Sequence, residues 1–142
     1  MEKKKIIILL ILFVAVAGLT ISSTNAATKT TGKIYFKDGK SVTKSLGNKQ
    51  ILNVYYTSKR SEGQGLWSPN TMVINIYSSN HKPPKYELVK ATVKFSKKVN
   101  GKTYYSTKTF KATKSELSDN KWIYYSPKNS YKPYSAVVTY KD

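Results

Sequence analysis

Short runs of β-branched and aromatic residues recur along the chain after residue 27, and clusters of Gly, Pro, Asn and Ser separate them roughly every 8 to 15 residues. This spacing is typical of antiparallel β-proteins, and the periodicity of helices is nearly absent. We therefore predict an all-β fold, a single antiparallel β-sandwich of about 7 to 8 strands. The strands are expected at residues 33–37, 42–46, 51–57, 72–77, 86–99, 102–112, 121–125 and 134–141.

Two short sequences predict tight turns between neighbouring strands. Residues 38–39 are Asp-Gly and residues 100–101 are Asn-Gly, which readily adopt the positive φ that two-residue hairpins require. A two-residue turn at the second of these places Lys108 opposite the apolar Val93. Either the strand that carries this lysine lies at a sheet edge, or a bulge shifts the register.

The β pattern is interrupted at residues 113–120. Thr113 is followed three residues later by Glu116, a spacing that resembles a helix capping box. We expect a single helical turn between two strands there.

The first 26 residues have the layout of an export signal. Three lysines at positions 3–5 precede an apolar run over residues 6–19, and small and polar residues lead to Ala26. We expect a signal helix at residues 1–26, cleavage after Ala26, and one domain over residues 27–142. The alternative is an uncleaved anchor, although a spanning helix usually needs about 20 apolar residues. In both cases the domain faces outward, either secreted or at the cell surface.

The chain is strongly basic, with 25 Lys and Arg against 7 Asp and Glu and a formal net charge of +18. Loss of residues 1–26 removes three lysines and one glutamate and leaves +16. Such a charge attracts anionic partners, and salt weakens the attraction. Candidate partners are anionic envelope or extracellular polymers, anionic lipid head groups and nucleic acid. Arg60 is the only arginine, which argues against specific recognition of bases; alternatively, the abundance of lysine reflects an AT-rich genome.

The sequence contains no cysteine. Disulfides and a lipid anchor attached through cysteine are therefore excluded, and the exported domain must be held together by burial of apolar side chains. The 116 residues that follow residue 26 are sufficient for the core of one domain.

Few residues are suited to catalysis. A glycosidase needs two facing carboxylates, and Glu62 with Glu87 is the only pair without an ordinary structural explanation. His81 has no second ligand residue at zinc spacing, and no Gly-Xaa-Ser-Xaa-Gly motif supplies a serine nucleophile. We expect a protein that is not an enzyme and has no cofactor and no metal.

The loop over residues 58–70 is the best candidate for a binding site. It combines Lys59, Arg60, two flexible glycines and Trp67, a mixture that can hold a ligand. The alternative for Trp67 is that it folds back to close one end of the sandwich. Tyr131, in a second loop with prolines, completes the set of candidate binding residues.

Tyrosine is the dominant aromatic residue, with 12 tyrosines against 4 phenylalanines. Doublets at residues 55–56, 104–105 and 124–125 must direct one ring to each face of a sheet, so roughly half of these rings should point outward. An outward tyrosine beside lysine stems is suited to contact with an anionic glycan.

Residues 99–140 contain a Val-Asn-Gly-Lys hairpin, a tyrosine-rich strand at residues 104–112, a strand with Trp122, and a last strand at residues 134–140. Together with the export signal and the absence of cysteine, this stretch resembles the immunoglobulin-like or fibronectin-type modules of adhesin-like surface proteins in archaea and bacteria. It covers roughly a third of the chain and lacks the paired cysteines of antibody domains. The resemblance implies a binding or structural role at a cell surface.

Our leading hypothesis is a non-enzymatic binding or structural module that associates with anionic envelope or extracellular polymers through faces rich in lysine and tyrosine. The alternative is a cationic membrane-active or toxin-like secreted effector, which needs an amphipathic segment or an exposed apolar patch. An enzyme of another type is the third hypothesis. We expect contact with a membrane only through the signal segment, if it is not cleaved.

Overall fold

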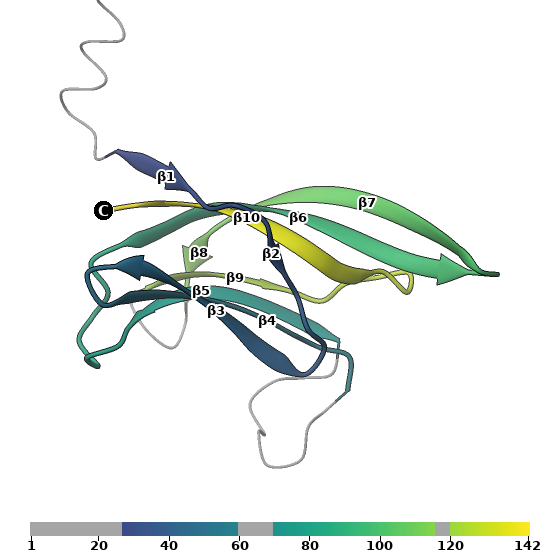
Figure 1. Cartoon of the computed structure of the whole chain (residues 1–142), viewed down its shortest axis with the longest axis horizontal. Coiled ribbons are helices and arrows are strands. Elements are labelled where there is room, and N and C mark those ends of the chain that lie inside the picture. Colours follow the sequence, from purple (N-terminus) through teal and green to yellow (C-terminus); the bar gives the residue numbers. More distant parts are fainter. Residues whose placement is uncertain (1–26, 60–69, 116–119) are drawn as a thin grey trace, which may run out of the picture.

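The computed structural model describes residues 27–59, 70–115 and 120–142. Within these residues the chain forms ten β-strands and no helix, and the strands make two antiparallel sheets. The two sheets lie one above the other, as expected for a sandwich (Figure 1). The prediction of an all-β fold is confirmed, whereas the predicted signal helix lies outside the described residues.

Each sheet contains five strands. In sheet A the order is β1 (Thr28–Thr30), β10 (Lys132–Lys141), β6 (Glu87–Val99) and β7 (Lys102–Lys111), and β2 (Ile34–Tyr35) also pairs with β10. In sheet B the order is β3 (Lys40–Gly47), β4 (Gln50–Thr57), β5 (Thr71–Ser78), β9 (Lys121–Tyr125) and β8 (Thr113–Lys114).

Each of the eight predicted strands overlaps an observed one. The prediction misses β1 and β8, because strands of three and two residues are too short to produce an alternating pattern. The predicted helical turn is wrong where the structure describes it. Thr113 pairs with Trp122, and the backbone N–H of Ser115 donates to the carbonyl oxygen of Asn120 at 2.9 Å, so strand pairing occupies the backbone groups that a helix needs. Glu116 lies outside the described residues.

The long hairpin of β6 and β7 has the register that its turn predicts. Val93 lies opposite Lys108, and Asn100 and Gly101 have φ angles of 51° and 80°. No register shift interrupts this pairing, and β7 pairs only with β6 among the described strands. The lysine therefore lies on an edge strand, and the alternative of a bulge in this hairpin is wrong.

The hydrophobic core lies between the sheets and is built from alternating residues of their central strands. Its fully buried aliphatic members are Leu52, Val54, Met72 and Ile74 from sheet B and Leu88, Ala91, Val93, Ala136 and Val138 from sheet A. Complete burial of one such side chain contributes about 1.5–3 kcal/mol, so a core of this kind can stabilise a domain without disulfides.

The hairpin of β6 and β7 extends past the strands of sheet B (Figure 1). β6 has 13 residues, whereas β9 has 5. All of β7 except Phe110 is exposed. Because sheet B does not cover the hairpin towards its tip, both of its faces are accessible there.

Candidate functional site

Three exposed tyrosines form a row on the outer face of sheet A. Tyr35 in β2, Tyr105 in β7 and Tyr134 in β10 are 50%, 53% and 43% exposed. The ring centroid of Tyr134 lies 5.4 Å from that of Tyr35 and 6.0 Å from that of Tyr105, with interplanar angles of 79° and 61°. We call these three residues the tyrosine row, with Tyr134 at its centre.

The sheet register explains why these rings remain uncovered. Tyr35 is paired with Ser135, and Tyr105 is paired with Ser96, so each ring has a small cross-strand neighbour. Tyr134 lies at a register shift in the pairing of β10 with β6. A β-bulge redirects a side chain, and here Tyr134 lies between the other two rings.

Two lysines of β6 border the tyrosine row. The Lys94 Nζ lies 4.5 Å from the centroid of the Tyr105 ring, a cation–π contact that contributes about 0.5–1 kcal/mol at an exposed site. Lys98 is exposed, and the alternation of the strand places it on the same face as Lys94. Neither lysine forms an ion pair with any acid that the structure describes.

A third lysine, Lys132, is oriented by Asp38. Its Nζ lies 3.9 Å from Oδ2 of Asp38. Oδ1 of Asp38 accepts a hydrogen bond from the backbone N–H of Ser58 at 2.8 Å, and Oδ2 accepts one from the Ser58 hydroxyl at 2.5 Å. Partial burial acts to raise the pKa of Asp38, but the hydrogen bonds from Ser58 and the charges of Lys132 and Lys59 outweigh it, and the pKa lies below its ordinary value of 3.8. Asp38 is therefore ionised at neutral pH. The tyrosine row with Lys94, Lys98 and Lys132 is called the tyrosine–lysine face below.

The tyrosine–lysine face contains an open hollow of about 530 Å³. It is lined by tyrosines, lysines and hydroxyl residues, namely Tyr105, Tyr134, Lys97, Lys98, Lys132, Ser96, Thr103 and Ser130. None of these residues is acidic. The rings offer flat surfaces for stacking, the ammonium groups attract anions, and the hydroxyl groups can donate and accept hydrogen bonds. The hollow is therefore suited to a polar, anionic ligand built of rings.

The residues that the sequence singles out for binding lie at or beyond the border of this face. Lys59 is exposed just after β4, and its charge, like that of Lys132, acts to lower the pKa of Asp38. Tyr131 is half-buried, and the Lys97 Nζ lies 4.7 Å from the centroid of its ring. Arg60 and Trp67 lie outside the described residues. Neither Lys59 nor Tyr131 belongs to the tyrosine row.

The sequence reasoning missed Tyr35 and Tyr134 because neither is part of a doublet. The doublet at residues 104–105 correctly indicates an outward ring at Tyr105, but Tyr104 is also 45% exposed because sheet B does not cover the hairpin there. Both rings of residues 55–56 are buried, so a doublet alone does not predict exposure. For Tyr35 a better signal is its small cross-strand neighbour, Ser135.

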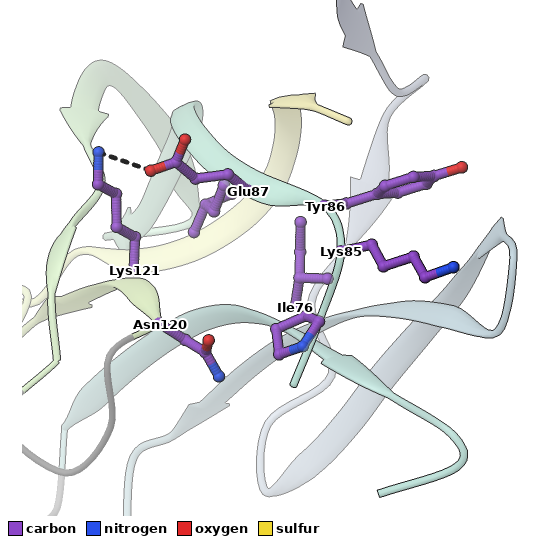
Figure 2. Close-up of a pocket in the computed structure, with 8 residues that line it drawn as sticks. Ile76, Lys85, Tyr86, Glu87, Asn120 and Lys121 are labelled. Atoms are coloured by element: carbon purple, nitrogen blue, oxygen red, sulfur yellow. Dashed lines mark ion pairs between the residues drawn. The ribbon is translucent and has the colours of Figure 1, made fainter. Parts of the chain in front are cut away.

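A smaller hollow, of about 120 Å³, lies near the start of β6 and contains Glu87 (Figure 2). The Glu87 carboxylate forms ion pairs with Lys121 of β9 at 2.8 Å and with Lys141 of β10 at 3.1 Å. Hydrogen bonds from these two lysines lower its pKa below the ordinary value of 4.5. Glu87 thus joins sheet A to sheet B, which gives it a structural role. Its predicted carboxylate partner, Glu62, lies outside the described residues, and His81 is exposed in a turn.

Among residues 27–59, 70–115 and 120–142, no group of three or more His, Asp or Glu side chains is arranged to hold a metal ion. The same three segments include no helix that is long and apolar enough to cross a membrane. Comparisons with models of protein families, with curated proteins and with solved structures find no match to this chain.

Proposed function

We propose that residues 27–142 form a non-enzymatic binding module, secreted or at the cell surface, that associates with an anionic polysaccharide of the envelope or extracellular matrix. The observation that carries this proposal is the tyrosine–lysine face, where three tyrosine rings in contact lie beside three lysines and a hollow without acidic residues. We also propose that the sandwich is of the immunoglobulin-like type. Such modules of surface proteins have a binding role, and the same role is proposed for this domain.

The tyrosine row is suited to sugar rings. A tyrosine side chain presents an apolar face and a hydroxyl group, so it can stack on a sugar and also form a hydrogen bond with it. A polysaccharide repeats such rings, and neighbouring tyrosines can contact successive units. Because the row is built on three strands of one sheet, its geometry is fixed before a ligand binds.

The lysines supply charge rather than a precise geometry. An ammonium group is a compact charge on a flexible stem, whereas arginine presents a planar fork for bidentate contacts. The repeated anionic groups of a polymer are better matched by the flexible charge of lysine than by the bidentate fork of arginine. The formal charge of +18 over the whole sequence also attracts such a polymer from a distance.

The exposed apolar residues favour this proposal over a membrane-active effector. A protein that inserts into a membrane surface needs a broad aliphatic or tryptophan-rich patch. The large exposed hydrophobic side chains of the described residues are six tyrosines and a single valine, Val99. Their hydroxyl groups prefer a wet surface to a lipid interior.

Binding to polygalacturonate, with neutral dextran as the comparison polymer, tests the proposal. Tyr134→Ala removes the centre of the tyrosine row, and loss of one anchoring aromatic side chain should cost about 1.4 kcal/mol, a tenfold weaker affinity for polygalacturonate. Tyr77→Ala is the matched control, because Tyr77 is 40% exposed but lies on sheet B. The affinity of this variant for polygalacturonate should equal that of the wild type. Equal weakening by both substitutions, or equal binding of both polymers, contradicts the proposal.

A further inference from the structure

A third hollow, of about 230 Å³, lies on the inward face of the β6–β7 hairpin, opposite to the tyrosine row. It is open to solvent and is bordered by the hairpin, the end of β9 and the turn that precedes β10, and its lining residues are Phe95, Ser106, Lys108, Tyr125, Pro127, Lys128, Asn129 and Tyr131. We call it the hairpin pocket.

Aromatic rings from both sheets form the floor of the hairpin pocket. Phe95 of sheet A is 4% exposed, and its ring centroid lies 5.8 Å from that of Tyr125 in sheet B. Tyr125 also contacts Phe110, with ring centroids 4.7 Å apart. This cluster is packed into the core, so the floor is rigid and mainly apolar.

Lys108 is positioned over this floor by aromatic rings. Its Nζ lies 4.7 Å from the centroid of Tyr125 and 5.3 Å from that of Phe110. It forms no ion pair with the acids that the structure describes, and Lys128 also lines the pocket. The lining of the pocket thus includes two lysines, of which Lys108 has its ammonium group above the rings, and no carboxylate.

A tight turn fixes the outer wall of the pocket. The backbone N–H of Tyr131 donates to the carbonyl oxygen of Lys128 at 3.2 Å, and Asn129 and Ser130 have φ angles of 60° and 64°. Positive φ at both central residues is the pattern of a type I′ turn. The turn holds the Asn129 amide and the Tyr131 ring at the pocket, where the Ser106 hydroxyl also lies.

We infer that the hairpin pocket binds one anionic sugar residue, with its ring beside Tyr131 and its negative group at Lys108 and Lys128. The Ser106 hydroxyl and the Asn129 amide can bind its hydroxyl groups. The volume equals that of roughly eight water molecules at about 30 Å³ each, which is room for a single sugar ring. The inference rests on the proposed function and deepens it, because it assigns a site for one residue of the same polysaccharide.

Lys97 places the hairpin pocket next to the tyrosine–lysine face. It lines the hollow of that face, and its Nζ lies over the ring of Tyr131, which lines the pocket. A polymer chain that bends around the hairpin at Lys97 can occupy both sites, with a terminal residue in the pocket and the preceding residues along the tyrosine row.

Titration of the protein with glucuronate, followed through backbone amide signals in NMR spectra, tests the inference. Glucuronate should shift the signals of Ser106 and Asn129, and glucose should bind at least tenfold more weakly. Lys108→Gln should abolish the shifts caused by glucuronate. Lys111→Gln is the matched control, because Lys111 is exposed on the same strand but does not line the pocket, and it should bind glucuronate like the wild type. An unchanged spectrum outside the substituted residue shows that Lys108→Gln remains folded.

The two proposals fail in different ways. Polygalacturonate binding without any glucuronate-induced shift at the pocket overturns this inference and leaves the proposed function intact. Equal shifts with glucose and glucuronate, or equal loss in the two lysine variants, also overturn it. Pocket shifts that occur with glucuronate but not with oligogalacturonate identify a free sugar acid as the ligand and overturn the assignment to the polymer. If Tyr134→Ala binds polygalacturonate like the wild type while glucuronate still binds in the pocket, the assignment of polymer binding to the tyrosine–lysine face is wrong.

Discussion

Glu87→Gln removes the charge that joins the two sheets and keeps the size of the side chain. Glu87 pairs with Lys121 of sheet B at 2.8 Å and with Lys141 of sheet A at 3.1 Å. The three side chains are 36%, 44% and 43% exposed, so each pair should contribute the 0.2–1 kcal/mol that is typical of a surface ion pair, about 1 kcal/mol for both. The substitution should therefore lower the free energy of unfolding by about 1 kcal/mol at neutral pH and low salt.

The contribution of Glu87 depends on pH in a defined direction. Hydrogen bonds from Lys121 and Lys141 lower its pKa in the folded state below 4.5, so the unfolded chain binds more protons in the acid range. The stabilisation is complete above the unfolded pKa and is lost as the pH falls through the folded pKa. The wild type and Glu87→Gln should therefore converge in stability at acid pH.

Urea denaturation of both proteins at pH 7 and at pH 3, in low and high salt, measures this effect. Asp142→Asn is the control, because its ion pair with Lys29 is longer, at 3.6 Å, and lies within sheet A. It should change the free energy of unfolding less than Glu87→Gln does. Equal stability of Glu87→Gln and wild type at pH 7 in low salt refutes the reasoning, as does a difference that persists unchanged at pH 3.

Three further substitutions test the fold. Gln50→Ala should cost about 1–3 kcal/mol in urea denaturation, because the buried Gln50 Oε1 accepts a hydrogen bond from the Lys85 N–H at 2.9 Å; a cost near zero contradicts this. Leu52→Ala should cost about 2–5 kcal/mol, because Leu52 is fully buried between the sheets, and a surface-like cost places it outside the core. Gly101→Ala should cost about 1–2 kcal/mol because alanine is strained at its φ of 80°, whereas the added Cβ meets no atom within 4 Å. A neutral result contradicts the turn geometry.

Local sequence signals predict the strands and the long hairpin well. Residues 100–101 fix the turn, and the register of Val93 with Lys108 follows from it by counting. The helical turn predicted from Thr113 is wrong because pairing with β9, which is not visible in the local sequence, outweighs the local capping pattern. Pairing partners of a short strand are distant in sequence, and a local pattern contains no information about them.

The tyrosine row is harder to predict because it depends on three separate strand pairings. Tyr35 and Tyr134 come together only when β2 pairs with β10, and Tyr105 joins them through β7 and β6. Tyr134 also depends on a register shift that the sequence does not mark. The abundance of tyrosine and lysine therefore predicts the chemistry of the candidate site, whereas its location depends on the assembled sheet.

The most direct test of the proposed function compares two double substitutions that remove the same charge. Lys94→Gln with Lys98→Gln alters the tyrosine–lysine face, and Lys40→Gln with Lys44→Gln alters β3 of sheet B. Affinity for polygalacturonate is measured for both variants and the wild type over a range of salt concentrations. The first variant should bind about five- to tenfold more weakly at low salt and lose affinity less steeply as salt rises, whereas the second should bind like the wild type. Equal weakening in both variants, or affinity that does not change with salt, contradicts a binding site on the tyrosine–lysine face.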